Sequence, residues 1–295
     1  MANTQDYKRR IKSVKNTAQL TKAMKMVSAA KLRRAQDAMI GARPFAAALK
    51  RTLAGVAKRA DSSISPLLAS RDVEKVDLIV VTADRGLCGS FNASIIKSAE
   101  LWREQMAAEG KQLTLTTFGR KATDYYRRRP HIDVREKIEN YSRSIEYTQA
   151  ADVAKVMEER FVSGETDAVY LAFNEFKNVV SQNVIVEPLL PFSKLEEAIA
   201  EGEADDRSAV DYIYEPSPQA LLENILSRFV AFELYHALLE STAAEHAARM
   251  TAMDSASRNA RDMIDKLTLE MNRIRQASIT TEIIEVVSGA AALGK

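Results

Sequence analysis

The chain has 295 residues, with 42 Lys and Arg against 40 Asp and Glu, three His and one Cys. A single Cys excludes a disulfide framework and suits a reducing compartment, and the apolar runs are too short and too interrupted by charge to span a bilayer. The hydrophobic fraction of 46% is too high for a disordered chain.

Residues that break helices are scarce and unevenly placed. The chain has 10 Gly and 7 Pro, with none in residues 1–40 and none in residues 219–288. Because Gly and Pro are the least favourable residues in a helix interior, these two stretches predict long helices at the two ends of the chain.

The first predicted helix covers residues 4–56. Apolar and small side chains recur there every three or four residues, which is typical of a helix that packs along one face against a partner helix. Gly41 and Pro44 are expected to bend or loosen it midway, because proline lacks the amide that would donate one turn back. The positions of this seam are Tyr7, Ile11, Val14, Ala18, Thr21, Ser28, Leu32, Ala35, Met39, Ala42, Ala46, Leu49, Leu53 and Val56.

The same region is strongly basic. Residues 1–60 hold 15 Lys and Arg against Asp6 and Asp37, so the rest of the chain carries a net charge of −11. Such a surface attracts an acidic partner, nucleic acid or an anionic membrane. Nucleic acid is disfavoured, because only Tyr7 and Phe45 could stack on bases and no reader motif is present.

Residues 75–215 alternate strand and helix patterns. This alternation predicts a small parallel sheet with crossover helices. Residues 193–208, with six acids between Glu196 and Asp206, predict a solvated loop. The expected strands are 75–82, 112–119, 167–174, 178–191 and a short last one at 210–214, and the expected helices are 93–109 and 149–162.

The C-terminal helix carries a clearer seam. Its apolar positions repeat about every 3.5 residues from Ile225 to Ile274, which indicates supercoiling against another helix. Pro216 and Pro218 mark its start, with Ser217 as a helix cap. The seam positions are Ile225, Phe229, Phe232, His236, Leu239, Ala243, His246, Met250, Met253, Ser257, Ala260, Ile264, Leu267, Met271 and Ile274, followed by the polar Ser278, Thr281 and Glu285.

Helix length decides the expected architecture. Seventy helical residues make a rod of about 105 Å, whereas a compact chain of this size has a diameter of about 50 Å. The rod cannot fit inside such a globule, so the two terminal helices are expected to pair. The predicted fold is α/β with long helices: an antiparallel coiled coil of the N- and C-terminal helices (1–60 and 216–295) plus a central Rossmann-like α/β domain (61–215).

One segment lies where phosphate-binding loops occur. TADRGLCGSFN (82–92) follows a predicted strand and precedes a predicted helix, so its glycines could open backbone amides to an anion. It contains neither Gly-Lys-Ser/Thr nor GxGxxG. A tight turn whose glycines allow positive φ or close packing is therefore favoured over a nucleotide site at residues 84–90.

The other candidate chemical residues also have simpler explanations. His236 and His246 fall on the C-terminal seam, where polar residues that fix the register are favoured over metal ligands because no zinc spacing is present. Cys88 has no His nearby in the sequence. No catalytic, metal or cofactor site is predicted.

Three segments together resemble a known family. They are IKSVKNTAQLTKAMKMVSAAKLRRAQ (11–36), TADRGLCGSFN (82–92) and ITTEIIEVVSGAA (279–291), and they look like the gamma subunit of F-type ATP synthases. The last segment matches the family signature at Ile279, Thr280, Glu282, Glu285, Gly289 and Ala290. The resemblance covers nearly the whole chain and implies the coiled coil and α/β domain described above.

The resemblance implies a mechanical function without a catalytic site. A gamma subunit is the central rotor shaft that couples proton flow through the membrane ring to ATP synthesis or hydrolysis at the beta subunits. The implied partners are the alpha and beta subunits of the catalytic hexamer, the epsilon subunit and the c-subunit ring. Membrane association is expected only through these partners, and no cofactor is implied.

The resemblance also implies which residues contact partners. Two positions lie on the N-terminal helix and six on the C-terminal helix, while three belong to the 82–92 segment, whose role in contact or coupling is left open. The implied contacts are Met24, Lys25, Arg85, Gly86, Gly89, Arg249, Arg275, Gln276, Thr280, Glu282 and Glu285. The apolar Ile283, Ile284, Val286, Val287 and Leu293 are expected to turn in an apolar bearing.

The predicted location is the cytoplasmic face of the bacterial inner membrane, as a peripheral protein. The first helix begins close to Met1, so no organellar presequence is expected. Two alternatives to the shaft stay open from the residues alone: a nucleotide-binding α/β enzyme with its site at 84–90, and a free-standing coiled-coil tether.

Overall fold

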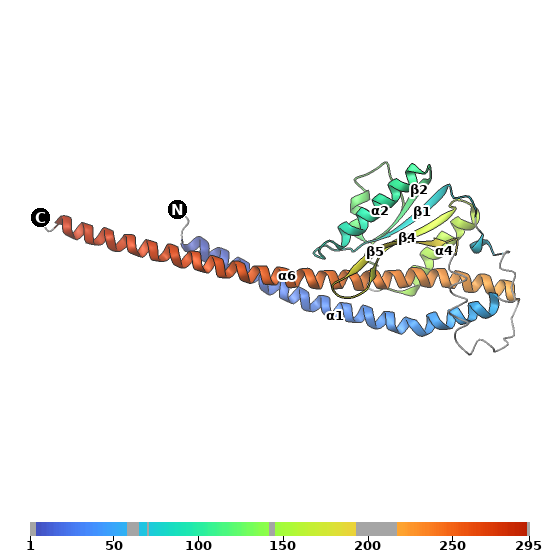
Figure 1. Cartoon of the computed structure of the whole chain (residues 1–295), viewed down its shortest axis with the longest axis horizontal. Coiled ribbons are helices and arrows are strands. Elements are labelled where there is room, and N and C mark those ends of the chain that lie inside the picture. Colours follow the sequence, from blue (N-terminus) through green and yellow to red (C-terminus); the bar gives the residue numbers. More distant parts are fainter. Residues whose placement is uncertain (1–3, 58–64, 70, 142–144, 193–216, 294–295) are drawn as a thin grey trace. The chain divides into compact units, whose positions relative to one another are not determined.

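The computed structural model describes residues 4–57, 65–69, 71–141, 145–192 and 217–293. Contacts divide the chain into two compact units. The first consists of residues 1–28 with 249–295, and the second of residues 29–248. Figure 1 shows the helices and strands of the chain, coloured from blue at the N-terminus to red at the C-terminus.

The second unit contains a five-stranded sheet in the order β3-β2-β1-β4-β5. Strands β1, β2, β3 and β4 run parallel, whereas β5 is antiparallel to β4. Connections between parallel strands need a crossover, and three helices supply them. The strands are β1 (Lys75–Val81), β2 (Gln112–Phe118), β3 (Asp133–Ile138), β4 (Ala168–Phe176) and β5 (Gln182–Leu190); the crossover helices are α2 (Phe91–Ala108), α3 (Arg120–Tyr126) and α4 (Tyr147–Ser163).

Both faces of the sheet are covered, which explains why β1 is buried without alternation from Val76 to Val81. On one face, Leu78 and Val80 pack with Ile95 of α2 and Tyr126 of α3. On the other face, α4 and the two long helices form a larger core, and Figure 1 shows α2 and α6 on opposite sides of the sheet. That core includes Ile79, Val81, Leu53, Met157, Phe161, Leu226 and Phe229.

The long helices are α1 (Thr4–Ala57) and α6 (Pro218–Leu293). Helix α1 continues through Gly41 and Pro44, so neither residue interrupts it. Helix α6 begins at Pro218, and the hydroxyl of Ser217 accepts a hydrogen bond from the Ala220 amide at 3.2 Å, which confirms the predicted cap. A short 3-10 helix, η2 (Pro66–Leu68), lies between α1 and β1.

In the first unit the two helices run antiparallel. Thr21 and Ser257 share a buried hydrogen bond of 2.7 Å, and Lys25 pairs with Asp254. Earlier on α1, Tyr7 interacts with Glu270, further along α6. Residue numbers therefore fall on one helix as they rise on the other, as predicted.

The seams follow the predicted positions. Each α1 seam residue is buried or half-buried, and so is each α6 seam residue up to Ile274. Ser278, Thr281 and Glu285, which follow, are exposed. The predicted fold, an α/β protein with long helices, is confirmed.

The sequence interpretation missed three elements, β3, α3 and the short helix η2, and it missed the packing of α6 against the sheet domain. Strand β3 and helix α3 were not predicted, because β3 is a charged edge strand and α3 has only seven residues. Residues 241–247 of α6 are all buried, since the sheet domain covers the side that the two-helix seam leaves open. The predictions for 193–208 and 210–214 lie outside the described residues.

Candidate interaction surfaces

The segment 82–92 forms a turn held by its own side chains. The Asn92 side-chain carbonyl accepts the Ala83 amide at 2.9 Å. One carboxylate oxygen of Asp84 accepts the amides of Arg120 and Asn140, at 3.1 and 2.8 Å. These bonds fix the turn to the start of α3 and to the segment that follows β3, which favours a structural role.

The turn also presents an unusual backbone. Gly89 has φ of 59° and Leu87 has φ of 64°. A left-handed conformation is ordinary for glycine but strained for leucine. Leu87 is 64% exposed, and Arg85 and Gly89 are exposed beside it. The turn therefore holds an apolar and a basic side chain toward solvent, and Leu87 was not signalled by the sequence.

No nucleotide-binding geometry accompanies this turn. The first amide of α2, from Phe91, donates to the Cys88 carbonyl at 3.2 Å, and the Ser94 amide donates to Ser90 at 2.8 Å. On the side of α6, Ala83, Cys88 and Phe91 pack against Ala244. Gly86 is half-buried, and a Cβ there would lie 3.9 Å from Lys121. The geometry favours the tight turn over the nucleotide site.

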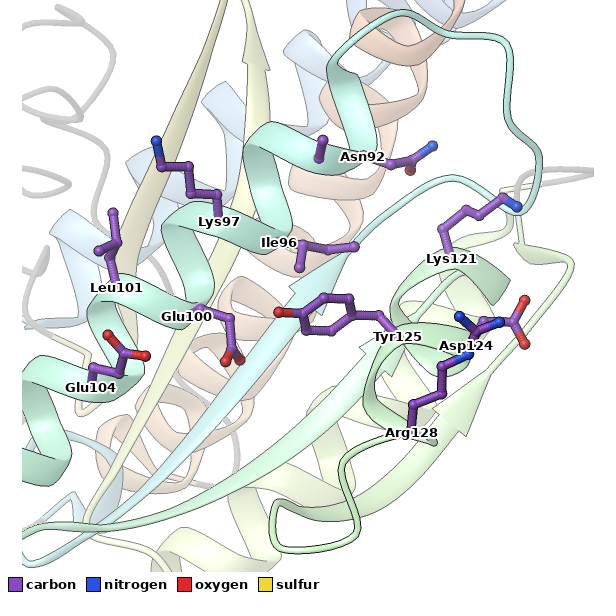
Figure 2. Close-up of a pocket in the computed structure, with 11 residues that line it drawn as sticks. Asn92, Ile96, Lys97, Glu100, Leu101, Glu104, Lys121, Asp124, Tyr125 and Arg128 are labelled. Carbon is purple, nitrogen blue, oxygen red and sulfur yellow. The ribbon is translucent and has the colours of Figure 1, made fainter.

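A cleft of about 650 Å³ lies between α2 and α3, and Figure 2 shows its lining. Lys97, Lys121 and Arg128 supply three positive charges there, matched by three acids, Glu100, Glu104 and Asp124. Glu100 is bound by Arg103 and Asp124 by Arg127. The residues that line the cleft therefore carry no net charge with which to select an anion. Among the described residues no cluster of His, Cys, Asp and Glu could hold a metal ion.

Two of the predicted contact residues lie together on α1. Lys25 pairs across the seam with Asp254, which Arg258 also approaches at 3.4 Å. The hydrogen bond from Lys25 lowers the pKa of the Asp254 carboxyl. Met24 is half-buried, while Met26 is 60% exposed. The Lys25 side chain is therefore held by an acid of the same chain. Of the two methionines, Met26 is the more exposed to solvent.

The remaining contact residues lie on α6. Arg249 is buried, with 8% of its surface exposed. Arg275, Gln276, Thr280, Glu282 and Glu285 are all exposed, and the Thr280 hydroxyl donates to the Gln276 carbonyl at 2.9 Å. Five large aliphatic side chains are exposed in the same stretch: Ile279 (47%), Ile283 (57%), Ile284 (59%), Val286 (72%) and Val287 (62%).

The predicted seam histidines behave as packed residues. His246 is buried, and His236 is half-buried with its Nε2 atom 3.7 Å from Glu240. Glu240, which the sequence interpretation did not single out, also accepts the Phe176 amide at the end of β4, at 3.3 Å. Its role could not be read from the sequence, because only the folded sheet brings β4 to this helix.

Comparison with known proteins identifies the family. The model of the ATP synthase family matches residues 3–293. An ATP synthase gamma chain of Geobacter metallireducens is 48% identical over 98% of both chains, and one of Solibacter usitatus is 50% identical over 97% of this chain and 98% of its own. The chain belongs to the ATP synthase gamma-chain family.

Chains in solved ATP synthase structures share the fold. A chain in the central stalk and c-ring structure of the Tetrahymena thermophila mitochondrial ATP synthase is 27% identical, with a TM-score of 0.59, over 81% of this chain and 99% of that chain. A chain from the Euglena gracilis mitochondrial ATP synthase has a TM-score of 0.69 at 19% identity, over 98% of this chain and 94% of that chain, and supports the fold alone. As a gamma chain, the protein is a non-catalytic subunit. In its described part, no helix is long and apolar enough to cross a membrane.

Proposed function

We propose that this chain is the central rotor shaft of an F-type ATP synthase, turning inside a hexamer of alpha and beta subunits. The observation that carries the proposal is the end of α6. The seam ends at Ile274, yet large aliphatic side chains continue at Ile279, Ile283, Ile284, Val286 and Val287, all about half or more exposed. An apolar patch of this kind marks a contact with another protein.

The shaft would act by making different contacts with chemically identical subunits. A conformational equilibrium moves only as far as the difference in binding between its two states allows. Changing the populations of two conformations of one subunit from 1:99 to 99:1 takes a difference of about 5.5 kcal/mol in binding free energy between them. A helical pair that is asymmetric about the rotation axis can supply this difference to each beta subunit in turn, and proton flow through the c-subunit ring would drive the turning.

Contacts with partner subunits are proposed for two groups of residues, of which the first would face the hexamer. Those on the long helices are Met24, Lys25, Arg249, Arg275, Gln276, Thr280, Glu282 and Glu285. Most are exposed or half-buried, whereas the buried Arg249 would act by positioning its neighbours. Arg85, Gly86 and Gly89 form the second group, at the turn where Arg85 and Leu87 are presented to solvent.

Charge supports an acidic partner around α1. Lys8, Arg9, Arg10, Lys12 and Lys15 are exposed in the first unit. An excess of like charge on one helix favours association with a surface of the opposite sign and speeds the encounter. The proposed acidic partner is the beta subunit, facing α1.

Membrane association is proposed to occur only through partners, at the cytoplasmic face of the bacterial inner membrane. The bacterial origin of the similar gamma chains supports this location. The epsilon subunit and the c-subunit ring would hold the shaft there.

Reconstitution tests the proposal. Purified alpha and beta subunits mixed with this chain should elute as one complex on gel filtration and hydrolyse ATP, whereas the chain alone should not. Single-molecule imaging should show ATP-driven rotation of the chain. Failure to form the complex would contradict the shaft, and ATP turnover by the isolated chain would favour the enzyme alternative.

A further inference from the structure

The helices on one face of the sheet enclose a pocket lined by aromatic rings. Its volume is about 350 Å³, and all of its residues belong to the second unit. Its walls come from α1, from the first residue of α4 and from α6. Three elements that are far apart in the sequence therefore build it. The lining residues are Ala38, Gly41, Ala42, Phe45, Tyr147, Phe232 and Tyr235.

One wall is a face of α1 with very small side chains. Ala38, Gly41 and Ala42 are spaced three and four residues apart, so they lie on the same face, and Phe45 follows one turn later. A Cβ at Gly41 would meet no atom within 4 Å. Glycine weakens a helix interior relative to alanine. Here its missing side chain leaves space that a larger residue would fill.

The other walls are aromatic rings that stand at steep angles to one another. The ring centroids of Phe45 and Tyr147 are 6.4 Å apart at 69°, and those of Tyr147 and Tyr235 are 5.8 Å apart at 78°. Phe45 also lies 5.5 Å from Phe232. Phe232 belongs to the buried core, and Tyr147 and Tyr235 pack against that core. The core therefore holds these walls in place, while Phe45, 47% exposed, borders solvent.

The chemistry of the lining selects an uncharged ligand. None of the seven residues carries a formal charge, so a charged ligand would lose its hydration without gaining an ion pair in the pocket. The 15 Lys and Arg of residues 1–60, against two acids, further disfavour a cation.

The side chains that line the pocket offer two polar groups, the hydroxyls of Tyr147 and Tyr235. The Tyr147 hydroxyl donates to the Arg228 carbonyl at 3.5 Å, so its oxygen can still accept a hydrogen bond. Burial raises the pKa of Tyr147, which keeps this hydroxyl protonated. A ligand with one hydroxyl or amine group could therefore be oriented by a single hydrogen bond.

We propose that this ring pocket, defined by its seven lining residues, binds a small uncharged aromatic molecule of about two fused rings. Aromatic rings attract one another edge-to-face or offset-stacked, at centroid separations of about 4.5–7 Å. The volume lies near the lower end of the range for ligand pockets, which favours a small ligand. Such a ligand would contact α1, α4 and α6 at once and would stabilise their packing. The site is separate from the partner contacts proposed above.

Calorimetry on the full chain tests the site, with 2-naphthol as the uncharged probe. Two charged probes, 2-naphthoate and tetramethylammonium, test the selection against ions. 2-Naphthol should bind at least about tenfold more tightly than 2-naphthoate, because the pocket offers no partner for a carboxylate. Tetramethylammonium, which binds aromatic cages built for cations, should bind more weakly than 2-naphthol. Tighter binding of either ion would overturn the assignment to an uncharged ligand.

A variant that fills the pocket tests its location. Gly41→Leu should lower the affinity for 2-naphthol by about tenfold or more, while the chain stays folded because the new side chain enters open space. Phe45→Ala removes one ring and should also weaken binding. Gly289→Leu is the matched control, since it makes the same change at an exposed glycine of a long helix with open space around it. Its affinity should equal that of the wild type.

NMR of labelled alanine methyl groups shows where the probe lies. Ala38 and Ala42 line the ring pocket, whereas Ala93 lines the larger cleft between α2 and α3. Bound 2-naphthol should shift the methyl signals of Ala38 and Ala42 and leave that of Ala93 in place. Shifts at Ala93 alone, no saturable shift at Ala38 and Ala42, or an unchanged affinity in Gly41→Leu would each overturn the proposed site.

Discussion

Gly119 shows how one residue can fix the position of a whole turn. Its φ of 91° suits glycine, and a Cβ there would lie 2.0 Å from the Thr82 carbonyl oxygen. Thr82 in turn accepts the Ala122 amide on its hydroxyl at 2.9 Å. The close approach of β1, β2 and α3 at this point therefore depends on the absence of a side chain.

Substitution of Gly119 should accordingly be far more costly than substitution of another left-handed glycine. Gly119→Ala is expected to lower the free energy of unfolding by about 3 kcal/mol or more, from backbone strain and a clash with fixed backbone. Gly110→Ala, at φ of 81° but with open space around it, should cost about 1 kcal/mol. Urea unfolding followed by circular dichroism measures both, and equal losses would contradict the clash.

The ion pair between Lys25 and Asp254 gives a prediction in pH. The hydrogen bond from Lys25 lowers the pKa of Asp254, so the pair stabilises the fold above the usual carboxyl pKa and this contribution is lost as pH falls through the lowered value. Lys25→Met should raise the pKa of Asp254, measured by carbon NMR of its carboxyl group. Lys22→Met, an exposed neighbour, is the control. An unchanged Asp254 titration in Lys25→Met would show that the pair is absent in solution.

The two long helices were predictable because their signal is repeated many times. A seam of three- and four-residue spacing can be recognised from the local sequence, without knowing which distant residues it contacts. Its end at Ile274 appears as a change from apolar to polar residues. Strand β3 gave no such signal. Its burial alternates between exposed and half-buried over charged residues, since it lies at the sheet edge, where neighbours on one side are missing.

The seam can be tested with a pair of methionines on α6. Met253 is 5% exposed, on the side that faces α1, and Met263 is 52% exposed. Met253→Asp should lower the free energy of unfolding by about 3 kcal/mol, since it buries an unpaired charge. Met263→Asp should change it by less than about 0.5 kcal/mol. Thermal unfolding of both variants measures these changes. Equal losses of unfolding free energy would mean that the helices do not pair through this face.

Function depends on features that only the complete molecule brings together. Sequence patterns predicted each long helix, and the resemblance implied which residues contact partners. The contact between α6 and the end of β4 could not be predicted from those patterns, because Phe176 and Glu240 lie far apart in the chain and meet only in the folded molecule. Residues 241–247 are all buried, although Ser241, Thr242 and Glu245 are polar or charged and lie outside the predicted seam.

The exposed end of α6 provides the test at the level of the assembly. Ile283 and Ile284 are 57% and 59% exposed, so replacing both with Asp should leave the melting temperature of the isolated chain nearly unchanged. In the proposed complex the same side chains are buried, and each buried Ile contributes about 1.5–3 kcal/mol. Each 1.4 kcal/mol of binding free energy changes the affinity tenfold. Binding of the double variant to the alpha and beta subunits should therefore weaken by about a hundredfold or more.

The control for this pair is Val180→Asp, which introduces the same charge at an 84% exposed valine on the β4–β5 turn. Binding measured by surface-immobilised hexamer should be unaffected by that change. If the paired variant binds as tightly as the wild type, the apolar end of α6 does not enter the hexamer. A free-standing coiled-coil tether would then explain the exposed end better than a shaft, because a tether needs no bearing at its tip.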